Sequence, residues 1–137
     1  MNIGLDIHGV IDRHPEIFFS LSQHWASLGY LIHIITGQSW ETAVHKVEKA
    51  NIVYHYHYSI VDYHKQSKDV KMWSDNKGWW MPDEDWNKSK GNYCKEANID
   101  IHFDDELQYA KYMPDTCTFV LVNKHFSPME NFFYPSI

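Results

Sequence analysis

The amino-acid sequence predicts an α/β domain built on a mostly parallel sheet. Short apolar segments typical of buried strands alternate along the chain with segments whose apolar residues recur at helical spacing. Three of the strand-like segments also end in polar residues, at Asp6 and His8, at Thr36, and at Asp104 and Asp105. Because parallel strands place such residues just beyond their carboxyl ends, we expect these side chains to lie close together.

The first half of the chain predicts two strand–helix pairs. The first strand is apolar on both faces, as buried parallel strands are. Pro15 suits the first turn of the helix that follows, and Gly29 suits its end. Ser39 is a favourable N-cap for the second helix. The elements expected here are a strand over residues 2–7, a helix over 14–28, a strand over 30–35 and a helix after Ser39.

The second half is dominated at first by aromatic residues. Tyrosine and histidine alternate over residues 54–58, which predicts a strand over 52–61. Two aromatic runs flank the turn-forming segment 74–78, which predicts a hairpin insertion at about 70–82. We expect its tryptophans to bury against the sheet, with stacking on a base or an oligomer contact as alternatives. The remaining expected elements are a helix over 83–97, a strand over 99–103, a short helix over 106–112 and a strand over 118–122, before an aperiodic tail at 127–137.

Length and composition limit the class of protein. A chain of 137 residues is expected to form a single domain spanning residues 1–137. The formal net charge of −6 argues against broad binding to nucleic acid and leaves a local basic groove open. Two cysteines outside any metal-binding spacing, and an apolar N-terminus interrupted by Asp6, predict a cytoplasmic protein without a signal peptide. No apolar run is long enough to cross a membrane.

Four short motifs occur in a distinctive order. They are DIHGV at residues 6–10, IHIIT ending at Thr36, Lys90 near the start of a helix, and IHFDD ending at Asp104 and Asp105. In this order they resemble the motifs of the haloacid dehalogenase-like superfamily of phosphatases and phosphotransferases. The segment 79–105, from WWMPDEDW to IHFDD, also looks like small phage and bacterial members without a large cap domain. The resemblance implies a three-layer, Rossmann-like parallel sheet with a small β-hairpin flap.

The resemblance also implies a chemistry, that of a phosphomonoester hydrolase. Asp6 would be the nucleophile that forms an aspartyl-phosphate, which water then hydrolyses. Lys90 would neutralise Asp6 and the transferring group, with Lys88 as a nearby competitor for this role. The hydroxyl of Thr36 and the N–H of Gly37 would hold phosphoryl oxygens. Catalysis would then consist mainly of positioning and charge stabilisation.

A cation is needed because a carboxylate and a phosphate dianion repel each other. The resemblance implies Mg²⁺, which takes oxygen ligands and keeps several waters. Asp6 and Asp104 would bind it directly, together with the backbone carbonyl of His8, and Asp105 would act through water. The alternative for Asp104 and Asp105 is an N-cap role before the short helix that follows.

The residue that departs from the family pattern is His8. Most phosphatases of the superfamily carry an aspartic acid there, which protonates the leaving oxygen and then activates water. An imidazole titrates near neutral pH and is able to take this role. The alternative is a catalytically degenerate module that keeps the fold and only binds or assembles. Asp12 is expected to anchor the segment after the nucleophile.

The interval between the first two motifs leaves no room for a large lid domain. The expected partner is therefore a phosphorylated small molecule, with nucleotides or the phosphate ends of nucleic acid suggested by the resemblance alone. Members without a large cap have open sites or borrow a neighbouring subunit, so a homo-oligomer is an open alternative. Membrane association is not expected.

Overall fold

The computed structural model describes residues 1–123 and contains a five-stranded, wholly parallel sheet in the order β3-β2-β1-β6-β7. Its strands are β1 (Asn2–Leu5), β2 (Leu31–Thr36), β3 (Tyr56–Ser59), β6 (Ile101–Asp104) and β7 (Thr118–Leu121). The predicted α/β class with a parallel sheet is confirmed, and the layout is consistent with a Rossmann-like fold.

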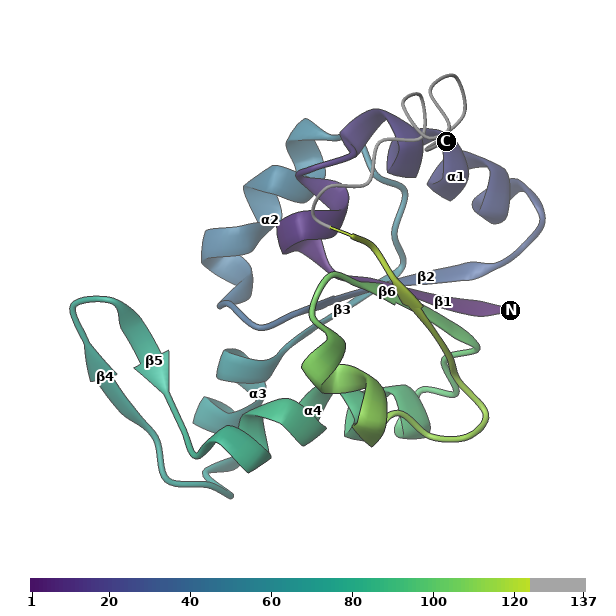
Figure 1. The fold of residues 1–137 in the computed structure, drawn as a ribbon. Helices are drawn as coiled ribbons and strands as arrows, with labels where there is room; N and C mark the ends of the chain where they lie inside the picture. Colours follow the sequence, from purple (N-terminus) through teal and green to yellow (C-terminus); the bar gives the residue numbers. More distant parts are fainter. Residues whose placement is uncertain (124–137) are drawn as a thin grey trace, which may run out of the picture.

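Helices cover both faces of this sheet. Figure 1 shows α1 (Pro15–Ser27) and α2 (Trp40–Lys49) on one face, and α3 (Ile60–Ser67) and α4 (Asp83–Glu96) on the other. The central strand β1 is buried between the layers, as its apolar residues predict. None of the helices within residues 1–123 has the length and apolar character needed to cross a bilayer.

The strand order creates a switch point between β1 and β6. From β1 the chain builds outward through β2 and β3, and it later returns to the other side of β1 to form β6 and β7. Ligands of open α/β sheets bind where the order reverses in this way. The register pairs Leu5 with Phe103, and the N–H of Asp6 donates to the carbonyl of Phe103 at 3.0 Å. Asp6 and Asp104, the next residues of the two strands, therefore emerge side by side.

A tight helical segment, η1 (Ile7–Ile11), follows β1 directly. Gly9 within it has φ +78°, a conformation that glycine adopts without strain. A Cβ added at Gly9 would also collide with the carboxylate of Asp105. Glycine at position 9 is therefore favoured for two reasons, the backbone conformation and the close approach of the loop that follows β6.

Two of the expected strands are too long. The strand expected over 2–7 ends at Leu5, before η1. The strand expected over 52–61 begins only at Tyr56, and it ends at Ser59 because α3 begins at Ile60. Ser59 caps this helix, its hydroxyl accepting a hydrogen bond from the N–H of Asp62 at 3.1 Å. His64 in α3 bridges Asp69 at 2.7 Å and Ser89 of α4 at 2.8 Å, and so ties the two helices together.

The predicted hairpin is present as β4 (Trp73–Asp75) and β5 (Gly78–Trp80), which pair antiparallel. Figure 1 shows it projecting from the body of the molecule beside α3 and α4. The expectation that its tryptophans bury against the sheet is wrong, because Trp73, Trp79 and Trp80 are 47 %, 40 % and 42 % exposed.

The remaining segment between β6 and β7 is a 3₁₀ helix, η2 (Leu107–Tyr112), which packs closely on α4. A Cβ at Gly91 of α4 would collide with the carbonyl of Tyr112, so glycine permits this approach. The packing brings Tyr109 next to Lys90. Both cysteines, Cys94 and Cys117, are buried free thiols, as expected.

Candidate active site

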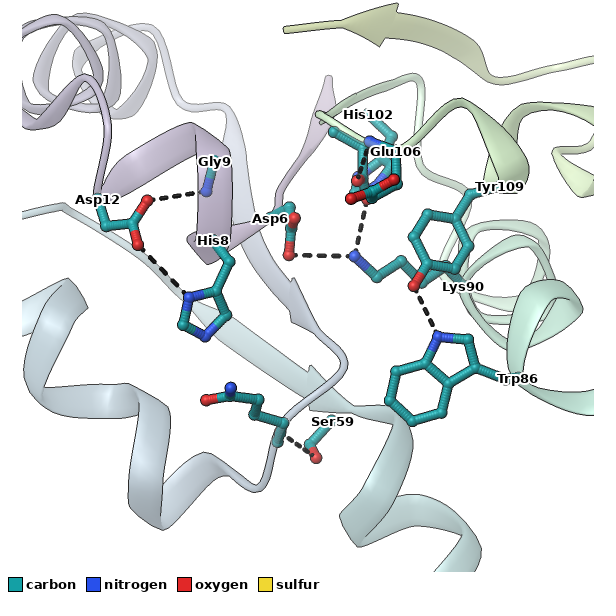
Figure 2. A network of polar contacts seen from close by, with 12 residues as sticks. Asp6, His8, Gly9, Asp12, Ser59, Trp86, Lys90, His102, Glu106 and Tyr109 are labelled. Atoms are coloured by element: carbon teal, nitrogen blue, oxygen red, sulfur yellow. Dashed lines mark hydrogen bonds and ion pairs between the residues drawn. The ribbon is translucent and has the colours of Figure 1, made fainter. Parts of the chain in front are cut away.

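The centre of the candidate site is a buried lysine between two buried carboxylates. Lys90 is 1 % exposed, and its Nζ lies 3.1 Å from Oδ1 of Asp6 and 2.7 Å from Oδ2 of Asp104. Figure 2 shows Lys90 reaching from α4 toward Asp6 at the end of β1. Three elements far apart in sequence thus meet at the switch point of the sheet, which is the convergence expected from the strand ends.

Asp105 joins these two carboxylates. One oxygen from each of Asp6, Asp104 and Asp105 lies within 4.8 Å of the others. Two ligands on opposite sides of Mg²⁺ are about 4.2 Å apart, given metal–oxygen distances of about 2.1 Å. The cluster is therefore close to the size that a divalent cation needs, and one carboxylate acting through water would complete the fit. With all three carboxyl groups ionised, one ammonium would leave an excess of negative charge, which a bound cation would neutralise.

The environment gives the two buried carboxyl groups, Asp6 and Asp104, different pKa values. Burial, opposed by Lys90 and reinforced by the charge of Asp104, raises the pKa of Asp6 to about 8. Asp104 is buried as well, but the charge of Lys90 and a hydrogen bond from His102 outweigh its burial and hold its pKa below the ordinary value. Burial and the charges of Asp104 and Glu106 raise the pKa of Asp105. Asp104 is thus the firmly ionised member, and Asp6 needs further positive charge to ionise near neutral pH.

His102 is a member of the site that the sequence analysis did not single out. It is fully buried in β6, and its Nε2 lies 2.9 Å from Oδ2 of Asp104. A histidine that bonds a ligating carboxylate from behind fixes its orientation. The available signal was its position two residues before Asp104, which places both side chains on the same face of the strand.

The loop after β2 borders the candidate site. Thr36 is fully buried, and its hydroxyl has no hydrogen-bond partner among residues 1–123, so it is available to a ligand. A Cβ at Gly37 would lie 2.6 Å from the ring of Trp86, which shows how closely the loop and α4 approach. The Trp86 indole donates to the hydroxyl of Tyr109 at 2.7 Å, and the Tyr109 ring lies 4.6 Å from Nζ of Lys90.

The side chain of His8 points toward α2 and not toward Lys90. Nδ1 of His8 accepts a hydrogen bond from Nζ of Lys46 at 3.0 Å and lies 3.4 Å from Oδ2 of Asp12. Figure 2 shows His8 and Asp12 on one side of Asp6, with Trp86 and Tyr109 on the other. Because the lysine donates to Nδ1, the neutral ring carries its proton on Nε2. Nε2 is buried without a hydrogen-bond partner among the described residues.

Asp12 has the anchoring contacts that the sequence suggested. Its Oδ1 accepts from the N–H of Gly9 at 2.8 Å, and its Oδ2 lies 3.2 Å from Lys46. Although partial burial opposes it, these contacts lower the pKa of Asp12. The turn that carries His8 is thereby held against α2.

Of the sequence-predicted site residues, the structure brings together Asp6, Lys90, Asp104 and Asp105. Thr36 and Gly37 lie on the neighbouring strand end, and the His8 ring is engaged elsewhere. Tyr109 and Lys46 were not singled out, and Trp86 was considered only as one of a cluster of tryptophans, because their contacts depend on the packing of α4, η2 and α2. Comparisons with protein-family models, curated proteins and solved structures find no match for this chain.

Proposed function

We propose that this chain is a Mg²⁺-dependent phosphomonoester hydrolase of the haloacid dehalogenase-like type, with Asp6 as its nucleophile. One observation carries the proposal. Three carboxylate oxygens lie within 4.8 Å of one another at the switch point of a parallel sheet, with a buried lysine in contact with two of the carboxylates. Such a site suits anionic substrates, because it combines an acidic nucleophile with the cations needed to bring phosphate near it.

In the proposed reaction, an oxygen of Asp6 attacks phosphorus and the bond from phosphorus to the ester oxygen breaks. The leaving oxygen takes up a proton and departs as an alcohol. Water then attacks the phosphorus of the aspartyl-phosphate, loses a proton, and releases inorganic phosphate and the free carboxylate. Lys90 offsets the charge on Asp6 and on the transferring group, and the unpartnered hydroxyl of Thr36 donates to a phosphoryl oxygen.

The acid–base properties of Asp6 support a requirement for the metal. When bound, Mg²⁺ supplies positive charge that favours the carboxylate and offsets its repulsion from phosphate. With its pKa raised to about 8 by burial, Asp6 alone is mostly protonated at neutral pH and is a poor nucleophile. Asp104, supported from behind by His102, is the anchor that stays ionised.

His8 is the candidate proton donor to the leaving oxygen through Nε2. Its Nδ1 is occupied by Lys46 and lies near Asp12, so Nε2 is the nitrogen left for the substrate.

The test is hydrolysis of p-nitrophenyl phosphate with Mg²⁺, comparing the unaltered protein with Asp6→Asn. Asp115→Asn, a change at an exposed carboxylate outside the site, is the matched control. We expect turnover that needs Mg²⁺, survives in the control and falls at least about a thousandfold in Asp6→Asn. Equal turnover by Asp6→Asn, or no turnover of any monoester between pH 5 and 9, would overturn the proposal.

A second candidate is a module that binds a phosphorylated ligand without turnover. The observation favouring it is the His8 ring, whose Nδ1 is engaged with Lys46 and Asp12 away from Asp6. This module would bind Mg²⁺ and inorganic phosphate, but no phosphate release would occur with any monoester. Beryllium fluoride would separate the two, because it forms a stable adduct with a carboxylate competent to be phosphorylated and should stabilise the unaltered protein, not Asp6→Asn.

A further inference from the structure

A hollow lies beside the candidate active site. Its volume is about 360 Å³, and residues of β5, α4 and η2 line it. Three of these are tryptophans, namely Trp79, Trp80 and Trp86. Exposed tryptophans gathered around a concave surface are unusual for a protein that only needs to bury them. They offer flat apolar faces against which a planar ring can stack.

The polar side chains that line the hollow are two amides, Asn87 and Gln108, and the carboxylate of Asp83. Nε2 of Gln108 donates to Oδ1 of Asn87 at 3.0 Å, and both side chains line the hollow. This leaves the NH₂ group of Asn87 and the carbonyl oxygen of Gln108 without hydrogen-bond partners among residues 1–123. A donor next to an acceptor matches the polar edge of a nucleobase, which presents both kinds of group.

Trp86 connects the hollow to the candidate active site. It lines the hollow, packs on Gly37 of the loop after β2, and donates to Tyr109, whose ring lies against Lys90. A single indole therefore lines the hollow and also contacts the candidate site, where Figure 2 shows it beside Tyr109. A ligand with an aromatic ring in the hollow would have the rest of its atoms directed along Trp86 toward Thr36, Asp6 and Lys90.

We infer that this hollow is a subsite for the base of a nucleoside monophosphate whose phosphate is the group attacked by Asp6. The inference rests on the proposed function and adds its substrate class. A free nucleotide and a phosphorylated oligonucleotide end present the same base and phosphate. The formal charge of −6 works against the longer polyanion, so the free nucleotide is the expected ligand.

The test uses nucleosides, which carry the base and no phosphate. Adenosine and uridine are titrated into the full chain, with binding followed by tryptophan fluorescence and calorimetry, and ribose serves as the ligand without a base. We expect saturable binding of a nucleoside and none of ribose. Trp80→Leu should weaken nucleoside binding at least about tenfold, as loss of a stacking partner does. Gln108→Ala should weaken it as well and alters no packed side chain of the core.

Trp73→Leu is the matched control. Trp73 is an exposed tryptophan of the same hairpin, paired with Trp80 across the strands, and it does not line the hollow. Nucleoside binding should stay within about twofold of the unaltered protein in this variant. Absence of nucleoside binding to the unaltered protein, or equal loss in Trp73→Leu and Trp80→Leu, would overturn the inference.

Turnover separates this inference from the proposed function. If p-nitrophenyl phosphate is hydrolysed in a manner that depends on Asp6 and nucleosides do not bind, the subsite is wrong and the function stands. If nucleosides bind with the expected variant pattern and no monoester is hydrolysed, the hydrolase proposal fails and the base site stands. Assaying a nucleoside 5′-monophosphate beside a 5′-phosphorylated oligonucleotide identifies the source: faster release from the free nucleotide supports the assignment, and faster release from the oligonucleotide overturns it.

Discussion

Replacing Asp6 by asparagine should stabilise the metal-free protein at neutral pH. Burial raises the pKa of Asp6 from 3.8 to about 8, so the folded protein holds a proton that the unfolded chain releases. Between these two values the folded state binds more protons, and its stability falls as the pH rises. Each pH unit costs about 1.4 kcal/mol, so about 4 kcal/mol is lost between pH 3.8 and pH 7. An uncharged amide of the same shape avoids this loss.

The assay is urea unfolding in the presence of a chelator, at pH 4.5, 6 and 7.5. The gain in unfolding free energy of Asp6→Asn should be about 1 kcal/mol at pH 4.5 and about 5 kcal/mol at pH 7.5. Asp115→Asn, at an exposed position, should differ little from the unaltered protein at every pH. A stability difference for Asp6→Asn that is zero or negative at pH 7.5, or that does not grow with pH, would refute the electrostatic reasoning.

Adding Mg²⁺ should narrow the stability difference between the two proteins. A cation that binds only the folded state stabilises it by about 2.7 kcal/mol at one hundred times its dissociation constant. The unaltered protein should gain this stability, and Asp6→Asn, which lacks one of the three clustered carboxylates, should gain much less. Equal stabilisation of both proteins would show that the cation binds elsewhere.

Three further outcomes are expected. Lys90→Met should cost about 3–5 kcal/mol in urea unfolding, because it leaves two buried carboxylates without their cation; a loss below 1 kcal/mol would contradict this role. Gly9→Ala should lower the unfolding free energy more than Gly29→Ala does, because both glycines have positive φ but only Gly9 faces the carboxylate of Asp105. Gly9→Ala should also weaken Mg²⁺ binding in a titration. Asp12→Asn should lower the unfolding free energy at neutral pH and progressively less in acid. Despite partial burial, the hydrogen bond from the Gly9 N–H helps lower the pKa of Asp12. The stability contributed by the Asp12 carboxylate is therefore lost as the pH falls through its pKa.

The sequence could predict the features that depend on local periodicity and on strand ends. Apolar runs predicted β1 and β2, and Pro15 and Gly29 predicted the limits of α1, because these signals act within one element. The predicted end of the third strand was wrong, because a local signal for a helix start competed with the strand pattern. Alternating aromatic residues favoured a longer strand, and the cap formed by Ser59 decided otherwise.

Some residues of the candidate site could likewise be predicted from the sequence, and others could not. Asp6, Asp104 and Asp105 could be identified because each follows an apolar strand, and parallel strands bring such positions to one edge of a sheet. Lys90 was preferred over Lys88 from its place near the start of a helix, but its burial in contact with both carboxylates depends on how α4 packs.

By itself, then, the sequence determined the strands, the helices and the acidic residues at the strand ends, since periodicity and turn chemistry are local properties. Only the tertiary structure decided which other side chains contact the residues of the candidate site. His102 supports Asp104, Lys46 engages His8, and Trp86 lines the hollow and also packs on Gly37 of the candidate site. These contacts depend on how helices pack across the sheet, and packing is set by shape and volume over long sequence separations that no local pattern records.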